Sequence, residues 1–274
     1  MKAQRSSLTN SVFAIISLLF IVGCQGSFLK NEFERGEKAR KEQDFEKALS
    51  HYDRIIQRAP ESSLGIEAGR LAAHLSMHEI KDYQKSIGYL KFLILNATDQ
   101  DDRLKAQRDL AALYFEKLSD YQQAIIEYNK LLAVREDPGN KVGYRMNIAK
   151  AYFYMSKFYQ AEVEVLNLLK QNLSEDQKFT GKLLLATIHF TNKELDKAIV
   201  KYEELMADYP EQARAQNVPM NLVVCYEEKS QFDKAIALLE GFKPFANEAD
   251  LLDFKIKRLR ERKSNQPGSR GLRK

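Results

Sequence analysis

An internal repeat is the feature that most constrains the fold of this 274-residue chain. A six-residue pattern, first seen as Asp44–Leu49 (DFEKAL), occurs six times with a small residue at its fifth position. We call these small residues the anchors; they are Ala48, Ser86, Ala124, Ala161, Ala198 and Ala235. Successive anchors are 38, 38, 37, 37 and 37 residues apart. A period of this length is typical of proteins that stack one supersecondary unit on the next.

Each anchor lies in a segment with the apolar periodicity of an α-helix. Positions −3, 0, +1, +4, +7 and +8 relative to the anchor share one helical face at about 3.6 residues per turn. Across the six repeats, 33 of these 36 positions are apolar or Ala. This count favours helix over strand. The anchor is small, so we expect another helix to cross it at short distance.

A second helical stretch precedes each anchor helix, as in residues 104–117 and 141–155. The two helices of a pair are joined by a short polar turn, and successive pairs by longer loops that are polar or contain Pro. One pair cannot bury its apolar face alone, so six pairs are expected to stack over residues 30–247. Residues 248–263 are predicted to form a capping helix, and residues 264–274 a disordered basic tail.

The repeats resemble the tetratricopeptide repeat, whose pattern places Gly, aromatic residues, Ala and Pro at fixed offsets. The first repeat has Gly36, Ala39, Ala48, Tyr52 and Pro60 at those offsets. Two features depart from the family: the period exceeds the usual length of about 34 residues, and the chain has no Trp. The resemblance implies an all-α fold, a right-handed α-solenoid of about six such helix pairs plus a C-terminal capping helix.

The N-terminus has the pattern of an export signal. Residues 1–10 are polar with two positive charges, and Val12–Val22 is apolar except for Ser17. These are the charged and apolar regions of a secretory signal peptide. The apolar run is short for a permanent membrane span, which needs about 20 residues.

The four residues Ile21–Cys24 (IVGC) resemble the lipobox of bacterial lipoproteins, although Ile21 and Val22 fit it loosely. The resemblance implies that residues 1–23 are removed, that Cys24 is lipidated and that residues 24–29 form a linker. In that family a residue other than Asp after the Cys, here Gln, favours the outer membrane. We therefore expect a lipoprotein in the inner leaflet of the outer membrane, facing the periplasm. The alternative is an uncleaved signal anchor that ends at Cys24.

The net charge of +5 is unevenly distributed. Residues 255–274 carry +8, residues 1–24 carry +2, and the body over residues 25–254 carries −5. An acidic body argues against nucleic acid as a partner, and the basic end has no aromatic residue for base stacking except Phe254 at its edge. The basic end is expected to be a solvated cap, or to contact an acidic protein or anionic head groups.

The sequence contains no P-loop, G-x-G-x-x-G or G-x-S-x-G motif. His74 and His78 are spaced as a zinc pair could be, but no third ligand is evident, and His74 is expected to face a neighbouring helix. No catalytic partner is evident for His51 or His189. Cys225 is expected to be a small core residue. We therefore predict that the protein is not an enzyme and has no cofactor or metal.

The first helix of each pair lines the inner surface of such a solenoid. The resemblance places the groove-facing residues 15, 11 and 8 positions before each anchor. The candidate partner-binding residues are Leu75, His78, Leu113, Met146, Lys150, Phe153, Leu183 and Phe190. If the apolar members are exposed, they form a groove for an extended peptide or an amphipathic helix. Alternatively, the winding of the solenoid buries them as core.

These features predict a non-catalytic protein–protein interaction scaffold that supports assembly of an envelope complex. The expected partners are envelope proteins or peptides in the groove. The resemblance favours outer-membrane protein assembly, with pilus or secretion-system assembly as an alternative. Two further alternatives are an accessory protein that binds peptidoglycan or glycolipid, and a self-assembling structural lipoprotein.

Overall fold

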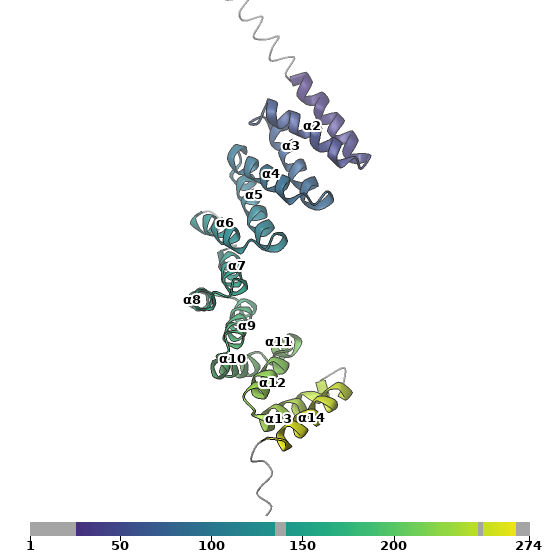
Figure 1. Ribbon diagram of the computed structural model, residues 1–274. Coiled ribbons are helices and arrows are strands. Elements are labelled where there is room, and N and C mark those ends of the chain that lie inside the picture. The colour runs from purple at the N-terminus through teal and green to yellow at the C-terminus, as the bar shows by residue number, and fades with distance from the viewer. Residues whose placement is uncertain (1–25, 135–140, 246–248, 267–274) are drawn as a thin grey trace, which may run out of the picture. The chain divides into compact units, whose positions relative to one another are not determined.

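The computed structural model describes residues 26–134, 141–245 and 249–266. Within these ranges the chain is all-α and contains no strand (Figure 1). It divides into two compact units, and the division falls after Leu131, inside helix α6 (Tyr121–Ala133). The expected signal peptide, Cys24 and residues 267–274 lie outside the described residues.

The first unit begins with a helix over residues 26–41, which includes residues 26–29 of the expected linker. The elements that follow before α6 are α2 (Phe45–Arg58), α3 (Ser63–His74), the π-helical turn η1 (Leu75–Glu79), α4 (Tyr83–Asn96), α5 (Gln100–Ala112) and the π-helical turn η2 (Leu113–Lys117). From α2 to α5, each helix packs against the next in chain order. This unit is the purple to teal part of Figure 1.

The second unit continues the same sequential packing. Its helices are α7 (Lys141–Tyr154), α8 (Phe158–Leu169), α9 (Glu175–Thr191), α10 (Leu195–Asp208), α11 (Pro210–Ala215), α12 (Val218–Glu228), α13 (Phe232–Phe242), the short 3₁₀ turn η4 (Lys243–Phe245) and α14 (Ala249–Ser264). Helix α14 packs on α13 and occupies the place of the expected capping helix. The short helix α11 was not expected, because the sequence there reads as a Pro-bearing loop.

The anchors are core residues in both units, as their small size predicts. All six are 0 % exposed: Ala48, Ala124, Ala161, Ala198 and Ala235, and also Ser86. The hydroxyl group of Ser86 donates to the carbonyl oxygen of Asp82 at 2.9 Å, and its oxygen lies 2.9 Å from that of the buried Ser76. A polar anchor is therefore tolerated because its hydroxyl group is satisfied inside the core.

The turn inside each helix pair contains a residue in the left-handed region of backbone space. These residues lie five positions before the six anchors, have φ between 51° and 62°, and none of them is Gly; they are Gln43, Lys81, Ser119, Ser156, Lys193 and Ser230. In the first three pairs an Asp follows this residue and its carboxylate accepts a hydrogen bond from a backbone N–H three residues on, at 3.3 Å for Asp44, 3.0 Å for Asp82 and 3.1 Å for Asp120. This is the usual N-cap arrangement, and it fixes where the anchor helix begins.

The two π-helical turns account for the longer spacing of the first three anchors. In η1 the N–H of Ile80 donates to the carbonyl of Leu75 at 3.0 Å, and in η2 the N–H of Leu118 donates to that of Leu113 at 3.1 Å. These are bonds across five residues instead of four, so each turn accommodates one extra residue within the first helix of its pair. The extra residue lies inside the helix and not in the loops.

Because of this insertion, the residues upstream of each π-helical turn lie one position further from their anchor than the equivalent residues of a regular repeat. The buried small residue 12 positions before the anchor is Ala149 in the fourth repeat and Ala186 in the fifth, each 0 % exposed. In the second repeat the equivalent buried small residue is Ala73, which lies 13 positions before its anchor. His74 is consequently exposed and does not occupy the buried small-residue position; it lines a cavity together with α5.

Among the described residues, no helix combines the length and the apolar character needed to cross a membrane.

Candidate functional site

Three of the candidate groove residues belong to the core. Leu75 is 3 % exposed, Leu113 is 2 % exposed and Met146 is 8 % exposed. Because of the π-helical turns, Leu75 and Leu113 take the buried position that Ile188 occupies in the fifth repeat. Met146 packs with Leu168 and Leu173. These three side chains therefore do not contribute to an open apolar groove.

The other five candidates keep exposed surface. His78 is exposed, and the half-buried residues are Lys150, Phe153, Leu183 and Phe190. Lys150 and Phe153 lie on α7, and Leu183 and Phe190 lie on α9, which contacts α7. In each of these two pairs the residues are three or seven positions apart, so they share one face of their helix.

The aromatic side chains on this face are held in place by their neighbours. The ring of Phe153 lies 6.0 Å from that of Phe158, measured between centroids. The ammonium group of Lys193 lies 5.7 Å from the centre of the Phe190 ring, within the range of a cation–π contact. The first helices α7 and α9 thus present fixed, partly exposed aromatic groups with a nearby cation.

In the first unit the corresponding face is polar. The exposed side chains of α3 and η1 there are Arg70, His74 and His78, spaced four residues apart. They line one side of a cavity of about 310 Å³, and α5 lines the other side. The floor is apolar and includes Leu90 and Leu93 of α4. The apolar groove expected from Leu75 and Leu113 is therefore replaced by a polar surface that includes two histidines.

The charges around this cavity are mostly paired. Arg70 donates to Asp102 of α5 at 2.6 Å and also contacts Glu67. The rings of His74 and His78 lie 4.7 Å apart, measured between centroids. Burial raises the pKa of Asp109, and the nearby cations and His78 only partly oppose this shift. A partner side chain would meet an apolar floor with both donors and acceptors at the rim.

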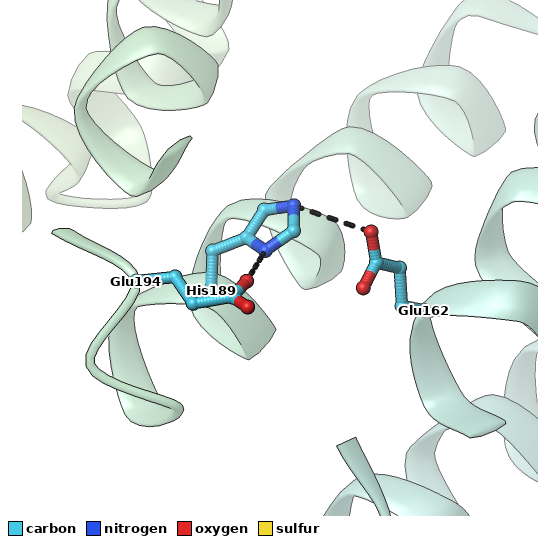
Figure 2. A group of neighbouring side chains, drawn as sticks. All are labelled: Glu162, His189 and Glu194. Atoms are coloured by element: carbon cyan, nitrogen blue, oxygen red, sulfur yellow. Dashed lines mark hydrogen bonds and ion pairs between the residues drawn. The ribbon is translucent and has the colours of Figure 1, made fainter. Parts of the chain in front are cut away.

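Glu162 of α8, His189 of α9 and Glu194, the N-cap residue of α10, form a cluster in the second unit (Figure 2). The Nδ1 atom of His189 lies 2.7 Å from a carboxylate oxygen of Glu194, and its Nε2 atom lies 3.8 Å from one of Glu162. Hydrogen bonds from His189 and then Lys197 hold the pKa of Glu194 below its usual value. His189 is 3 % exposed, so the cluster fixes the ring inside the core.

The ligand atoms of this cluster lie within 4.8 Å of one another, which is close enough for a cation to be considered. The two nitrogens of His189, however, face different carboxylates, and one ion cannot bind both nitrogens of the same ring. Each nitrogen of the imidazole thus has a carboxylate of its own, hydrogen-bonded in the case of Glu194 and at longer range in the case of Glu162. Sequence reasoning missed it, although His189 and Glu194 flank a predicted turn and are five residues apart.

A second buried network was also missed. Glu32, in the helix over residues 26–41, is 3 % exposed. Its carboxylate lies 2.9 Å from the Nδ1 atom of His51 and 3.1 Å from Arg54. Burial raises the pKa of Glu32, but the hydrogen bonds and charges of these two residues together lower the pKa by more than burial raises it. The pKa of Glu32 therefore lies below its usual value. The network joins the helix over residues 26–41 to α2.

Cys225 is a core residue of α12, as predicted. It is 0 % exposed, and burial raises the pKa of its thiol to about 11. A thiol in this environment is protonated at neutral pH and a poor nucleophile.

No protein-family model matches the chain, and no curated protein matches it. Solved structures do match. A tetratricopeptide repeat protein from Parabacteroides merdae ATCC 43184 superimposes with a TM-score of 0.52 at 16 % identity, over 87 % of this chain and 88 % of that one. PilW, a widely conserved type IV pilus biogenesis factor, superimposes with a TM-score of 0.51 at 12 % identity, over 82 % of this chain and 97 % of its own. The chain therefore has the all-α fold of tetratricopeptide-repeat proteins.

Proposed function

We propose that this protein is a non-catalytic scaffold that binds partner proteins through the first helices of its repeats. The observation that carries the proposal is the partly exposed face of α7 and α9 with Phe153, Leu183 and Phe190. Aromatic and aliphatic side chains that are fixed on one face, with a cation nearby, are typical of a surface that binds a peptide or a helix. The fold supports the proposal, because stacked helix pairs offer extended binding surfaces.

The test is capture of partners from the cell envelope by the purified full chain, with Phe153→Glu compared with Tyr159→Glu. Tyr159 lies on the neighbouring helix α8 and is 75 % exposed, so the control makes the same kind of charge change on another surface. We expect Phe153→Glu to reduce capture at least about fivefold, as for an interface anchor, and the control to leave it unchanged. Lys150→Glu tests the same face without removing a packed ring. Equal capture by all four proteins would contradict the proposal.

We further propose that lipid on Cys24 holds this scaffold at the outer membrane, facing the periplasm. The support is the Ile21–Cys24 sequence after an apolar run, and acyl chains on the Cys would provide stable anchoring. Cys24→Ala is expected to give an unprocessed or soluble protein. An unchanged membrane fraction and unchanged gel mobility would contradict lipidation.

Within this framework the sequence favours outer-membrane protein assembly, and the likeness in fold to PilW favours pilus assembly as a second candidate. Photo-crosslinking in the native cell from a residue of the binding face, such as Lys150, separates the two. Crosslinks to barrel-assembly proteins would support the first, and crosslinks to pilus proteins the second. Crosslinks to cell-wall glycan alone would exclude both.

A further inference from the structure

A second surface lies between α12 and the last helix, α14. The two helices enclose a cleft of about 400 Å³. Its floor includes Leu252 and Leu259, which are 6 % and 1 % exposed. At its edge, Leu251 and Phe254 are each 59 % exposed, although both are large and apolar. The cleft therefore joins a buried apolar floor to an exposed apolar edge.

The charges of this cleft are unbalanced. Three cations line it, Lys255, Arg258 and Arg262, with a single carboxylate, that of Glu227. Lys255 and Arg262 both bind Glu227, at 3.2 Å and 2.8 Å. This pairing fixes two cations on the cleft wall and leaves its lining with an excess of positive charge.

Arg258 is the third cation of the cleft, and it does not bind Glu227. Its guanidinium carbon lies 6.0 Å from the centre of the Phe254 ring, so the side chain rests along the apolar edge. In the part of the chain that the structure describes, Arg258 has no carboxylate partner. An incoming carboxylate would therefore meet a positioned guanidinium group directly beside exposed apolar surface.

We infer that this cleft binds an acidic amphipathic segment of another protein, with an apolar side chain on the cleft floor and a carboxylate on Arg258. The ends of the chain itself do not fit, because residues 267–274 hold three cations and residues 1–25 hold two, with no acidic residue in either. A planar lipid surface could touch Leu251 and Phe254 but could not reach a floor recessed between two helices. The inference rests on the proposed function, since it names the class of partner for one surface of the scaffold.

The test uses the purified full chain and three fluorescein-labelled synthetic helical peptides of equal length. The first is an amphipathic helix with Leu at positions i, i+3, i+4 and i+7 and Glu on the opposite face, the second has Lys in place of Glu, and the third has Ser in place of Leu. Fluorescence anisotropy should show binding of the first peptide only, and binding should weaken as salt is added. Equal binding of the Lys peptide or of the Ser peptide would overturn the inference.

Two charge reversals on α14 locate the site. Arg258→Glu should weaken binding of the acidic peptide about tenfold, because it replaces an attraction by a repulsion of similar size. Lys257→Glu makes the same change one residue earlier, but Lys257 lies beside another cavity, lined by Glu240 and Arg260, and should change binding less than about twofold. Phe254→Ser removes an exposed side chain and should also weaken binding. Equal effects of the two charge reversals would overturn the inference.

A vesicle arm separates a protein partner from a membrane. Vesicles of phosphatidylcholine and phosphatidylglycerol are added to the same variants in a flotation assay. If the wild-type chain binds the vesicles, and both charge reversals lose this binding equally while no peptide binds, the surface is a membrane contact and the inference is wrong. The α7 and α9 face is tested separately by Phe153→Glu, so the failure of one experiment does not imply the failure of the other.

Discussion

Replacement of Ser119 by Gly is expected to stabilise the first unit. Ser119 has φ of 51° in the turn before α6, and its side chain is exposed. A β-carbon in the left-handed region costs roughly 1 to 2 kcal/mol. Gly avoids that cost, but it adds about 0.5 to 1 kcal/mol of conformational freedom to the unfolded chain. Taken from the middle of each range, the difference is a net gain of about 0.75 kcal/mol in the free energy of unfolding.

The matched control is Ser50→Gly, which makes the same chemical change at an exposed position within α2, where the backbone is helical. There the substitution should cost about 0.5 to 1 kcal/mol, since Gly weakens a helix interior. Lys81 has φ of 61° in the preceding turn. Because the two turns are separate, the double variant with Lys81→Gly should gain about twice as much as Ser119→Gly alone.

The measurement is urea unfolding of the full chain, followed by far-ultraviolet circular dichroism. The transition of the first unit should move to higher urea concentration for Ser119→Gly and to lower concentration for Ser50→Gly. If both substitutions move the transition in the same direction, the left-handed backbone is not what determines stability at the turn, and the reasoning is refuted.

Three further predictions concern the core. Deletion of His78 within η1 should restore a regular helix. It should therefore cost less stability than deletion of Thr187 in α9, where the missing residue rotates a regular helix out of register. Comparable thermal unfolding of the two deletions would contradict this prediction. Ala161→Leu should destabilise the second unit by about 1 to 3 kcal/mol or more, because the anchor is 0 % exposed and a larger side chain in a packed core forces its neighbours apart; Ala161→Ser is the control, and unchanged urea unfolding of the Leu variant would exclude a close helix crossing. Burial raises the pKa of Glu32, but hydrogen bonds from His51 and Arg54 hold the pKa below 4.5. The contribution of Glu32 to stability is therefore present above about pH 4.5 and is lost as the pH falls below that value. Glu32→Gln should weaken this acid dependence of thermal unfolding, and an identical pH profile would contradict the assignment.

The repeat, the helix pairs and the anchors could all be predicted from the sequence. The anchor helices have one apolar stripe, and a small residue at a fixed place on that stripe implies a close helix crossing. This reasoning works because each anchor helix turns a polar face to solvent, so burial and pattern coincide. Ala48 and Ala235, in the first and the last repeat of the sequence, are both fully buried as expected.

The first helices were less predictable, because their apolar residues do not form a single stripe. A spacing of 38 residues instead of 37 shows that one residue has been added, but not where it lies. The assignment of Leu75 and Leu113 to the groove assumed a regular helix, and the π-helical turns made that assumption wrong. The network of Glu32 was missed for a different reason: its partner His51 is 19 residues away in the sequence.

The buried thiol of Cys225 allows the local opening of the second unit to be measured chemically. A thiol-specific reagent cannot reach a side chain with no exposed surface, and burial keeps the pKa of this thiol near 11. Modification must therefore wait until α12 separates from its neighbours, and in the limit of fast reclosing the rate of modification measures the free energy of that separation. Peptide mapping distinguishes Cys225 from Cys24, the other cysteine of the chain. The loosening or tightening of the second unit when a partner binds could thus be followed without introducing any label.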